Sequence, residues 1–218
     1  MSGSEERVRA AGIARWEQRF AGDDYLFGTR PNAFLAAQAH RLRPGMRALA
    51  VADGEGRNGV WLAQQGLDVL AVDASAAGLR KARTLAADRG VRLAIEQADL
   101  GRWPWPRERF DVVAAIFIQF ADPPLRDALF AGMQQALRPG GLLLLQGYRP
   151  QQLAYGTGGP PDLDKLYTAP LLRQAFAGLD IVHLAEHDSV LDEGAGHAGM
   201  SALIDLVARK PLAGQPLP

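Results

Sequence analysis

The sequence contains no cysteine, and this absence excludes several chemistries at once. Disulfide bonds, thiolate metal sites and a cysteine nucleophile are all ruled out. Long hydrophobic runs are also missing, because the longest, residues 112–118, is far shorter than the roughly 18 residues of a membrane-spanning helix. Residues 5–15 carry too many charges for a secretory signal. We therefore expect a cytoplasmic protein without a membrane partner.

An excess of charge of either sign is the next feature that the chain lacks. It has 24 Lys and Arg residues against 24 Asp and Glu residues, so the formal net charge is zero. Proteins that bind nucleic acids usually carry a basic surplus that neutralises phosphates, so we expect no nucleic-acid partner. With 218 residues and 48% hydrophobic residues, the chain is long enough to bury a core as one structural domain. The composition does not indicate an oligomeric state.

Strand-like and helix-like segments alternate from residue 45 onwards. This alternation predicts a parallel sheet with helices on both faces. Two helices, at 5–20 and 31–44, precede it, and the segment 22–30 between them is expected to fold over the sheet as a lid. Strands are expected at 48–52, 68–72, 91–97, 110–117 and 141–145, and helices at 57–65, 75–89 and 123–137.

The C-terminal part of the chain follows a different pattern. A long loop, 149–166, precedes a helix near 168–177, and two strand-like runs follow at 180–190 and 200–208. Their glycine-rich connection is too short for a crossover helix, so these two strands should be antiparallel. The predicted fold is a Rossmann-like α/β domain with a seven-stranded, mostly parallel sheet and an antiparallel C-terminal strand pair. Residues 211–218 are predicted to be a disordered tail.

The turn after the first strand carries the pattern G-x-G-x-x-G at Gly54, Gly56 and Gly59. Such glycines let a ligand approach the backbone at the N-terminus of a helix, although a tight strand–helix turn also requires glycine. Asp73 ends the second strand about 20 residues further on, where a carboxylate can accept hydrogen bonds from a ribose diol. The alternative for Asp73 is a helix cap. Asp99 follows the third strand, where an acid beside a backbone N–H can bind an adenine edge.

The chain contains Phe-Asp-Val-Val at 110–113 and Leu-Arg-Pro-Gly-Gly at 137–141, with the closing antiparallel pair. Together these features resemble those of class I S-adenosylmethionine-dependent methyltransferases. Gly-Glu-Gly-Arg-Asn at 54–58, followed by Trp-Leu-Ala at 61–63, resembles the tellurite-resistance branch of that family. The resemblance covers roughly residues 45–210 and implies that they form a methyltransferase domain, with residues 1–44 as N-terminal helices and lid-like segment. The chain departs from the family at Ala50 and Ala52, where an acid and a glycine are usual.

The resemblance implies S-adenosylmethionine as the cofactor and methyl transfer to a small molecule as the activity. By the same resemblance, the acceptor would be a soft chalcogen nucleophile such as tellurite, selenite or a thiol. The residues expected to contact the cofactor are Asp53, Gly54, Glu55, Gly56, Asn58, Asp73, Ala74, Asp99, Leu100 and Ile116.

Methyl transfer requires two reactants to be aligned and water to be excluded, since the leaving sulfur departs neutral. A soft nucleophile needs little more, whereas an amine or hydroxyl needs a base. In an open parallel sheet the ligand binds at the carboxyl ends of the strands, so we expect the catalytic residues in the loops at that edge. The candidates are His197, Tyr148, Tyr25 and Gln119. His197, with only Asp192 and Glu193 nearby, does not make a metal site, so none is predicted.

Two other functions stay open at this point. The literal G-x-G-x-x-G pattern suits a nicotinamide-dependent oxidoreductase, but no second mononucleotide-binding half and no Tyr-x-x-x-Lys pair are present. Alternatively, Ala50 and Ala52 are compatible with a non-catalytic module that binds the cofactor without turnover.

Overall fold

The computed structural model describes residues 3–212 and residue 214. Most of the predicted disordered tail, 211–218, therefore lies outside the described residues. In this part of the chain no helix is both long enough and apolar enough to cross a membrane. Along the chain the elements are α1 (Gly3–Phe20), α2 (Ala33–Ala37), η1 (Ala39–Arg41), β1 (Arg47–Val51), α3 (Arg57–Gln64), β2 (Asp68–Asp73), α4 (Ala76–Asp88), β3 (Ala94–Gln97), β4 (Phe110–Ile116), α5 (Pro123–Ala136), β5 (Leu137–Tyr148), α6 (Gln152–Tyr155), η2 (Leu163–Lys165), α7 (Ala169–Ala175), β6 (Asp180–Asp192) and β7 (Ala198–Arg209).

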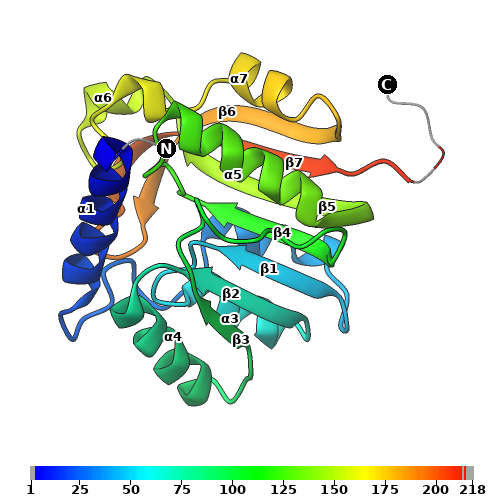
Figure 1. The fold of residues 1–218 in the computed structure, drawn as a ribbon, viewed down its shortest axis with the longest axis horizontal. Helices are drawn as coiled ribbons and strands as arrows, with labels where there is room; N and C mark the ends of the chain where they lie inside the picture. Colours follow the sequence, from blue (N-terminus) through cyan, green and yellow to red (C-terminus); the bar gives the residue numbers. More distant parts are fainter. Residues whose placement is uncertain (1–2, 213, 215–218) are drawn as a thin grey trace.

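The seven strands form one sheet in the order β3-β2-β1-β4-β5-β7-β6 (Figure 1). Strands β1 to β5 are parallel, and β7 is antiparallel to both β5 and β6. The predicted fold class is therefore confirmed. Because β6 runs in the direction of β5, the β6–β7 turn lies at the same edge as the loops that follow the parallel strands.

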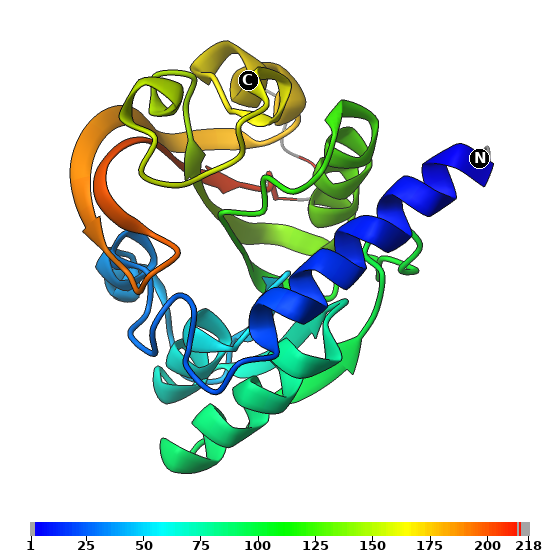
Figure 2. The ribbon, with the colours of Figure 1, turned by 90° about the vertical axis from the view of Figure 1, so that its left-hand side faces the viewer.

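The core lies on both faces of the sheet, which explains the continuous apolar sequence of β4 and β5. On one face, α5 packs through Leu129 and Met133 on strand residues such as Val113. On the other face, α2 and α3 pack through Leu35 and Leu62. Figure 2 shows α1 crossing the edge where β1 and β2 end, next to α4.

Four segments differ from the expectation drawn from the sequence. The strand expected at 91–97 begins only at Ala94, where its pairing with β2 starts. The helix expected at 31–44 is short, since α2 ends at Ala37 and a 3₁₀ turn follows it. Strand β5 extends to Tyr148, because it pairs with β7 along its whole C-terminal half, as far as Tyr148 opposite Leu203. The loop expected at 149–166 contains α6 and η2.

The contact between α5 and Trp105 yields a test of the core. Gly132 in α5 lies against Trp105, and a Cβ atom at Gly132 would lie 2.3 Å from the indole ring. We expect Gly132→Ala to lower the free energy of unfolding by about 2 kcal/mol, because α5 or Trp105 has to shift. Gly12→Ala in α1 is the matched control: no atom lies within 4 Å of its Cβ position, and alanine favours the helix by about 1 kcal/mol. Urea denaturation measures both, and a Gly132→Ala variant as stable as the wild type would contradict this packing.

Candidate functional site

The loop between β1 and α3 has an unusual backbone. Gly54 and Gly56 have positive φ values of 56° and 89°, and Ala52 has a φ of 50°. A non-glycine residue in this left-handed region is strained by about 1–2 kcal/mol. Ala52 stands where the resembled motif has glycine, and it still adopts a conformation that glycine favours. The substitution therefore leaves the shape of the turn in place.

Asp73, at the end of the neighbouring strand β2, holds this loop in place through hydrogen bonds. Its Oδ2 accepts a hydrogen bond from the backbone N–H of Gly54 at 2.8 Å, and its Oδ1 accepts one from the N–H of Ser75 at 2.8 Å. Burial raises the pKa of the Asp73 carboxyl. Each carboxylate oxygen can accept a second hydrogen bond, so Asp73 keeps the capacity to bind hydroxyl groups.

Asp53, also expected to contact the cofactor, points toward α3. Its Oδ1 accepts a hydrogen bond from the N–H of Gly59 at 3.0 Å, within the first turn of the helix. Burial raises the pKa of Asp53 to about 7, and the nearby Asp73 adds to this rise, although the Gly59 N–H lowers it in part. Asp53 is thus a buried carboxyl group that titrates near neutral pH.

Glu55 and Asn58 connect the glycine loop to the N-terminal segment. The Glu55 carboxylate accepts a hydrogen bond from the N–H of Leu26 at 2.8 Å. It also forms an ion pair with Lys81, whose Nζ lies 2.7 Å away. Asn58 Oδ1 accepts a hydrogen bond from the N–H of Asn32 at 3.0 Å. Both side chains hold the segment between α1 and α2 against the loop.

Helix α1 lies directly on the same loop. Phe20 covers Gly54 and Gly78, since Cβ atoms at these positions would lie 3.0 and 3.1 Å from its ring. Glu17 accepts a hydrogen bond from Ser75 Oγ and so contacts the N-terminus of α4. These contacts make α1 part of the site, a role that the sequence analysis did not assign to it.

The remaining candidates for cofactor contact lie along the same edge. Asp99, after β3, forms an ion pair with Arg9 of α1, with Oδ2 at 2.9 Å from Nε. Ala74 follows Asp73 directly, Leu100 is buried in the core, and Ile116 ends β4.

A second part of the site is an enclosure of aromatic rings around His197. The His197 ring lies 4.3 Å from Phe27, 4.3 Å from Phe117 and 5.8 Å from Tyr148, measured between ring centroids. Phe117 follows β4 and has a φ of 54°, which is strained for a large side chain. The aromatic rings connect the two parts of the site, because Phe27 beside His197 lies 6.2 Å, between ring centroids, from Phe20 of α1, which packs on the glycine loop.

Two polar atoms in this enclosure lack a partner. Among the side chains that the structure describes, Tyr148 Oη and His197 Nδ1 are buried without a hydrogen bond. Burial lowers the pKa of His197, so the imidazole is neutral at pH 7. Burial raises the pKa of Tyr148, so the phenol keeps its proton. A buried polar atom without a partner costs roughly 1–3 kcal/mol, which a bound ligand with complementary groups would recover.

The buried carboxylate of Glu193 lies beside the enclosure. Its Oε2 is 2.7 Å from Arg57 Nη2 and 3.9 Å from His197 Nδ1, and Asn32 Nδ2 donates to its Oε1 at 3.0 Å. Burial alone would raise the pKa of Glu193, but His197 and Arg57 hold it at about 2. No local pattern in the sequence indicates this ion pair, whose members lie on α3 and the β6–β7 turn.

The other two catalytic candidates are Tyr25 and Gln119. Unlike His197 and Tyr148, they use their polar groups in hydrogen bonds to the backbone. The Tyr25 hydroxyl donates to the carbonyl of Lys81 at 3.1 Å, on the side of α4. The Gln119 amide donates to the carbonyls of Tyr148 and Lys165 at 2.8 and 2.9 Å. Both side chains therefore fix backbone segments around the site.

The pKa of Asp53 gives a test of the glycine loop. Between the unfolded value of 3.8 and the folded value of about 7, the folded state holds a proton that the unfolded state releases. The free energy of unfolding should therefore fall as the pH rises from 4 to 7. We expect Asp53→Asn to be more stable than the wild type by about 1–3 kcal/mol at pH 8 and equally stable near pH 4.

Urea denaturation at pH 4, 6 and 8 measures this difference, with Asp68→Asn, an exposed residue at the start of β2, as the control. A difference between Asp53→Asn and the wild type that does not vary with pH would contradict the buried titration.

Residues 48–141 match the family model of a methyltransferase domain. An uncharacterized protein of Mycobacterium tuberculosis is 32% identical over 110 residues, covering 50% of this chain and 39% of that protein. The ubiquinone/menaquinone biosynthesis C-methyltransferase UbiE of Cupriavidus metallidurans is 30% identical over 115 residues, covering 51% of this chain and 46% of UbiE. The match thus spans less than half the length of these curated relatives.

Solved structures show the same fold over nearly the whole chain. The N-methyltransferase NodS of Bradyrhizobium japonicum, in complex with S-adenosyl-L-homocysteine, has a TM-score of 0.68 and 14% identity, covering 92% of this chain and 98% of NodS. TehB of Haemophilus influenzae has a TM-score of 0.69 and 14% identity, covering 91% of this chain and 67% of TehB. The similarity extends to several kinds of methyltransferase and does not single out the tellurite-resistance branch. Over residues 48–141 the chain is thus similar to a methyltransferase domain, and over nearly its whole length it has the fold of these solved structures.

Proposed function

We propose that this protein transfers a methyl group from S-adenosylmethionine to a small-molecule acceptor bound next to His197 and Tyr148. The observation that carries this proposal is the pair of buried, unpartnered polar atoms, His197 Nδ1 and Tyr148 Oη, inside an aromatic enclosure. The enclosure is closed by Phe27 and by Phe117, so a bound acceptor would be shielded from water. Exclusion of water and alignment of the reactants are the main requirements of methyl transfer.

The donor set at the glycine loop fits the cofactor. Asp73 offers carboxylate oxygens to ribose hydroxyls, Asp99 offers one to an adenine amine, and Gly54 and Gly78 present backbone without side chains. When bound there, S-adenosylmethionine supplies the electrophilic methyl group. Since Phe20 covers Gly54 in this structure, α1 and the cofactor share one surface, and binding of the cofactor is coupled to the placement of α1.

Of the chalcogen acceptors, a thiol suits this enclosure best. The neutral imidazole of His197 can take the thiol proton, after which the sulfur lone pair forms the new S–C bond. The methyl group's bond to the sulfonium sulfur breaks, and its electron pair stays on that sulfur. Oxyanions such as tellurite or selenite suit the site less, because Arg57, the cation beside His197, is already held by the charged carboxylate of Glu193.

The strand order argues against the oxidoreductase alternative. In this sheet β7 lies between β5 and β6 and is antiparallel to both. Dinucleotide-binding folds have a parallel sixth strand next to the fifth. The backbone of Ala52 keeps the shape of the glycine turn, so the alanine at this position is not by itself an argument for the module without turnover.

Thermal denaturation with S-adenosylhomocysteine or with NADH tests the cofactor. At about 100 times its dissociation constant, S-adenosylhomocysteine should raise the Tm by about 5–10 °C, and NADH should not. Asp73→Asn should lose most of this rise, because the ribose hydroxyls lose a charged acceptor. Asp68→Asn, at the exposed start of the same strand, should keep it. A rise with NADH alone, or an undiminished rise in Asp73→Asn, would refute the assignment.

The pH dependence of methyl transfer tests the acceptor and the role of His197. With a thiol acceptor, we expect His197→Asn to lower kcat by about 10²–10⁴ at pH 7, because the proton acceptor is lost. The rate of the variant should recover toward pH 9, where a thiol with a pKa near 8.5 ionises without help. Tyr148→Phe keeps the ring and serves as the comparison for packing. Faster turnover of tellurite than of thiols, or a wild-type pH profile in His197→Asn, would exclude this mechanism.

A further inference from the structure

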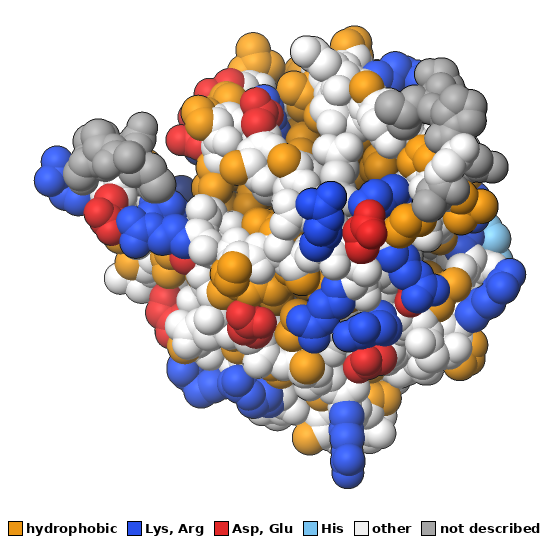
Figure 3. Space-filling view, turned by 45° about the vertical axis from the view of Figure 1, so that its right-hand side comes forward, with side chains coloured by type: hydrophobic (Ala, Val, Ile, Leu, Met, Phe, Trp, Pro, Cys, Tyr) orange, Lys and Arg blue, Asp and Glu red, His pale blue; other side chains and the backbone are white. Residues whose placement is uncertain are grey.

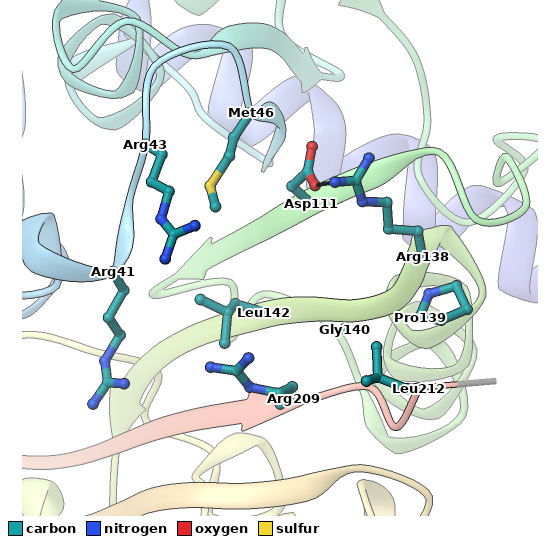
Figure 4. Close-up of a pocket in the computed structure, with 10 residues that line it drawn as sticks. All are labelled: Arg41, Arg43, Met46, Asp111, Arg138, Pro139, Gly140, Leu142, Arg209 and Leu212. Carbon is teal, nitrogen blue, oxygen red and sulfur yellow. Dashed lines mark ion pairs between the residues drawn. The ribbon is translucent and has the colours of Figure 1, made fainter. Parts of the chain in front are cut away.

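A second concave surface lies at the opposite edge of the sheet, at the amino ends of β1, β4 and β5. It is a cavity of about 330 Å³ between the connection from α2 to β1, the start of β5 and the end of β7 (Figure 4). The five residues of strand β1 lie between this cavity and the glycine loop, and they span roughly 17 Å. The cavity is therefore distinct from the methyl-transfer site.

Positive charge is concentrated around this cavity, although the chain as a whole is neutral. Its walls carry Arg41, Arg43, Arg138 and Arg209, against one acid, Asp111. Figure 3 shows Lys and Arg side chains gathered on this face of the molecule.

Only one of these arginines is neutralised by a carboxylate. Arg138 forms an ion pair with Asp111, which also accepts a hydrogen bond from the N–H of Arg47 at 2.8 Å. Within residues 6–212, Arg41, Arg43 and Arg209 form no ion pair. This holds although Asp180 lies opposite Arg209 in the β6–β7 ladder. Arg41 donates only to the neutral side chain of Gln38. Three unpaired guanidinium groups around one cavity repel each other, and a bound anion would relieve that repulsion.

The lining between the arginines is apolar. The buried Leu142 lies between the guanidinium groups of Arg43 and Arg209, Met46 lies beside Arg43, and Pro139 and Leu212 close one side (Figure 4). We propose that this cavity binds a small organic anion, with a phosphate or carboxylate head held by Arg43 and Arg209 and an apolar body against Met46 and Leu142. Guanidinium groups bind such heads through paired hydrogen bonds. The concave, partly apolar lining favours a small ligand over the extended backbone of a nucleic acid.

Isothermal titration of the full chain at constant ionic strength, with phenyl phosphate and inorganic phosphate as probes, tests this proposal. We expect phenyl phosphate to bind with a Kd below about 1 mM and inorganic phosphate more weakly, since it lacks the apolar body. The double variant Arg43→Gln/Arg209→Gln should bind phenyl phosphate at least about tenfold more weakly. The matched control, Arg83→Gln/Arg173→Gln, removes two exposed arginines from α4 and α7 and should bind it like the wild type.

The rise in Tm with S-adenosylhomocysteine serves as the folding check for both double variants. Equal binding by wild type and Arg43→Gln/Arg209→Gln, or an equal loss in the control, would overturn the site. Equal affinity for the two phosphates would overturn the apolar contact. Tighter binding of a 20-nucleotide RNA or of phosphatidylglycerol vesicles, lost in the same variant, would replace the small ligand by a polyanion or a membrane surface.

Discussion

The site depends on one buried carboxylate, that of Glu193. It accepts hydrogen bonds from Asn32 and from the N–H of Ala33, and it pairs with Arg57 at 2.7 Å. These donors come from the start of α2 and the start of α3, so a single side chain in the β6–β7 turn fixes two N-terminal elements. A buried charge is tolerated only when it is paired and fully hydrogen-bonded, and removing one member of such a pair costs about 3–5 kcal/mol. The position of His197, four residues further on, follows from this network.

Much of the fold could be predicted from the sequence, because its signals are local. The apolar runs of β4 and β5, the glycine turn and the short β6–β7 connection each determine the structure of their own segment. The limits of β5 could not be predicted in the same way. Pro139 and Gly140 have turn character, yet a register shift between β4 and β5 keeps the strand continuous there. Pairing across the sheet overrides local preference in such cases.

The site was only partly predictable, for a physical reason. Asp73 and His197 could be found because each follows a strand at a known edge of the sheet. The contact between Arg57 and Glu193 joins residues 136 positions apart, and nothing in either segment specifies the other. The same holds for Phe20 on Gly54. The polarity of Gln119 and its place after β4 suggest a catalytic role, but polarity alone does not distinguish a free amide from one that binds the backbone.

The distance in sequence between Asn32 and Glu193, 161 positions, has a consequence for the order of folding. Closing so long a loop costs conformational entropy, and only the interactions of the complete sheet offset this cost. Contacts of this kind therefore form late in folding. During synthesis, the glycine loop and the first strands leave the ribosome well before the hairpin that carries His197. A growing chain therefore completes its glycine loop before the aromatic rings close around His197, and the two parts of the candidate site come together only when the final strands have joined the sheet.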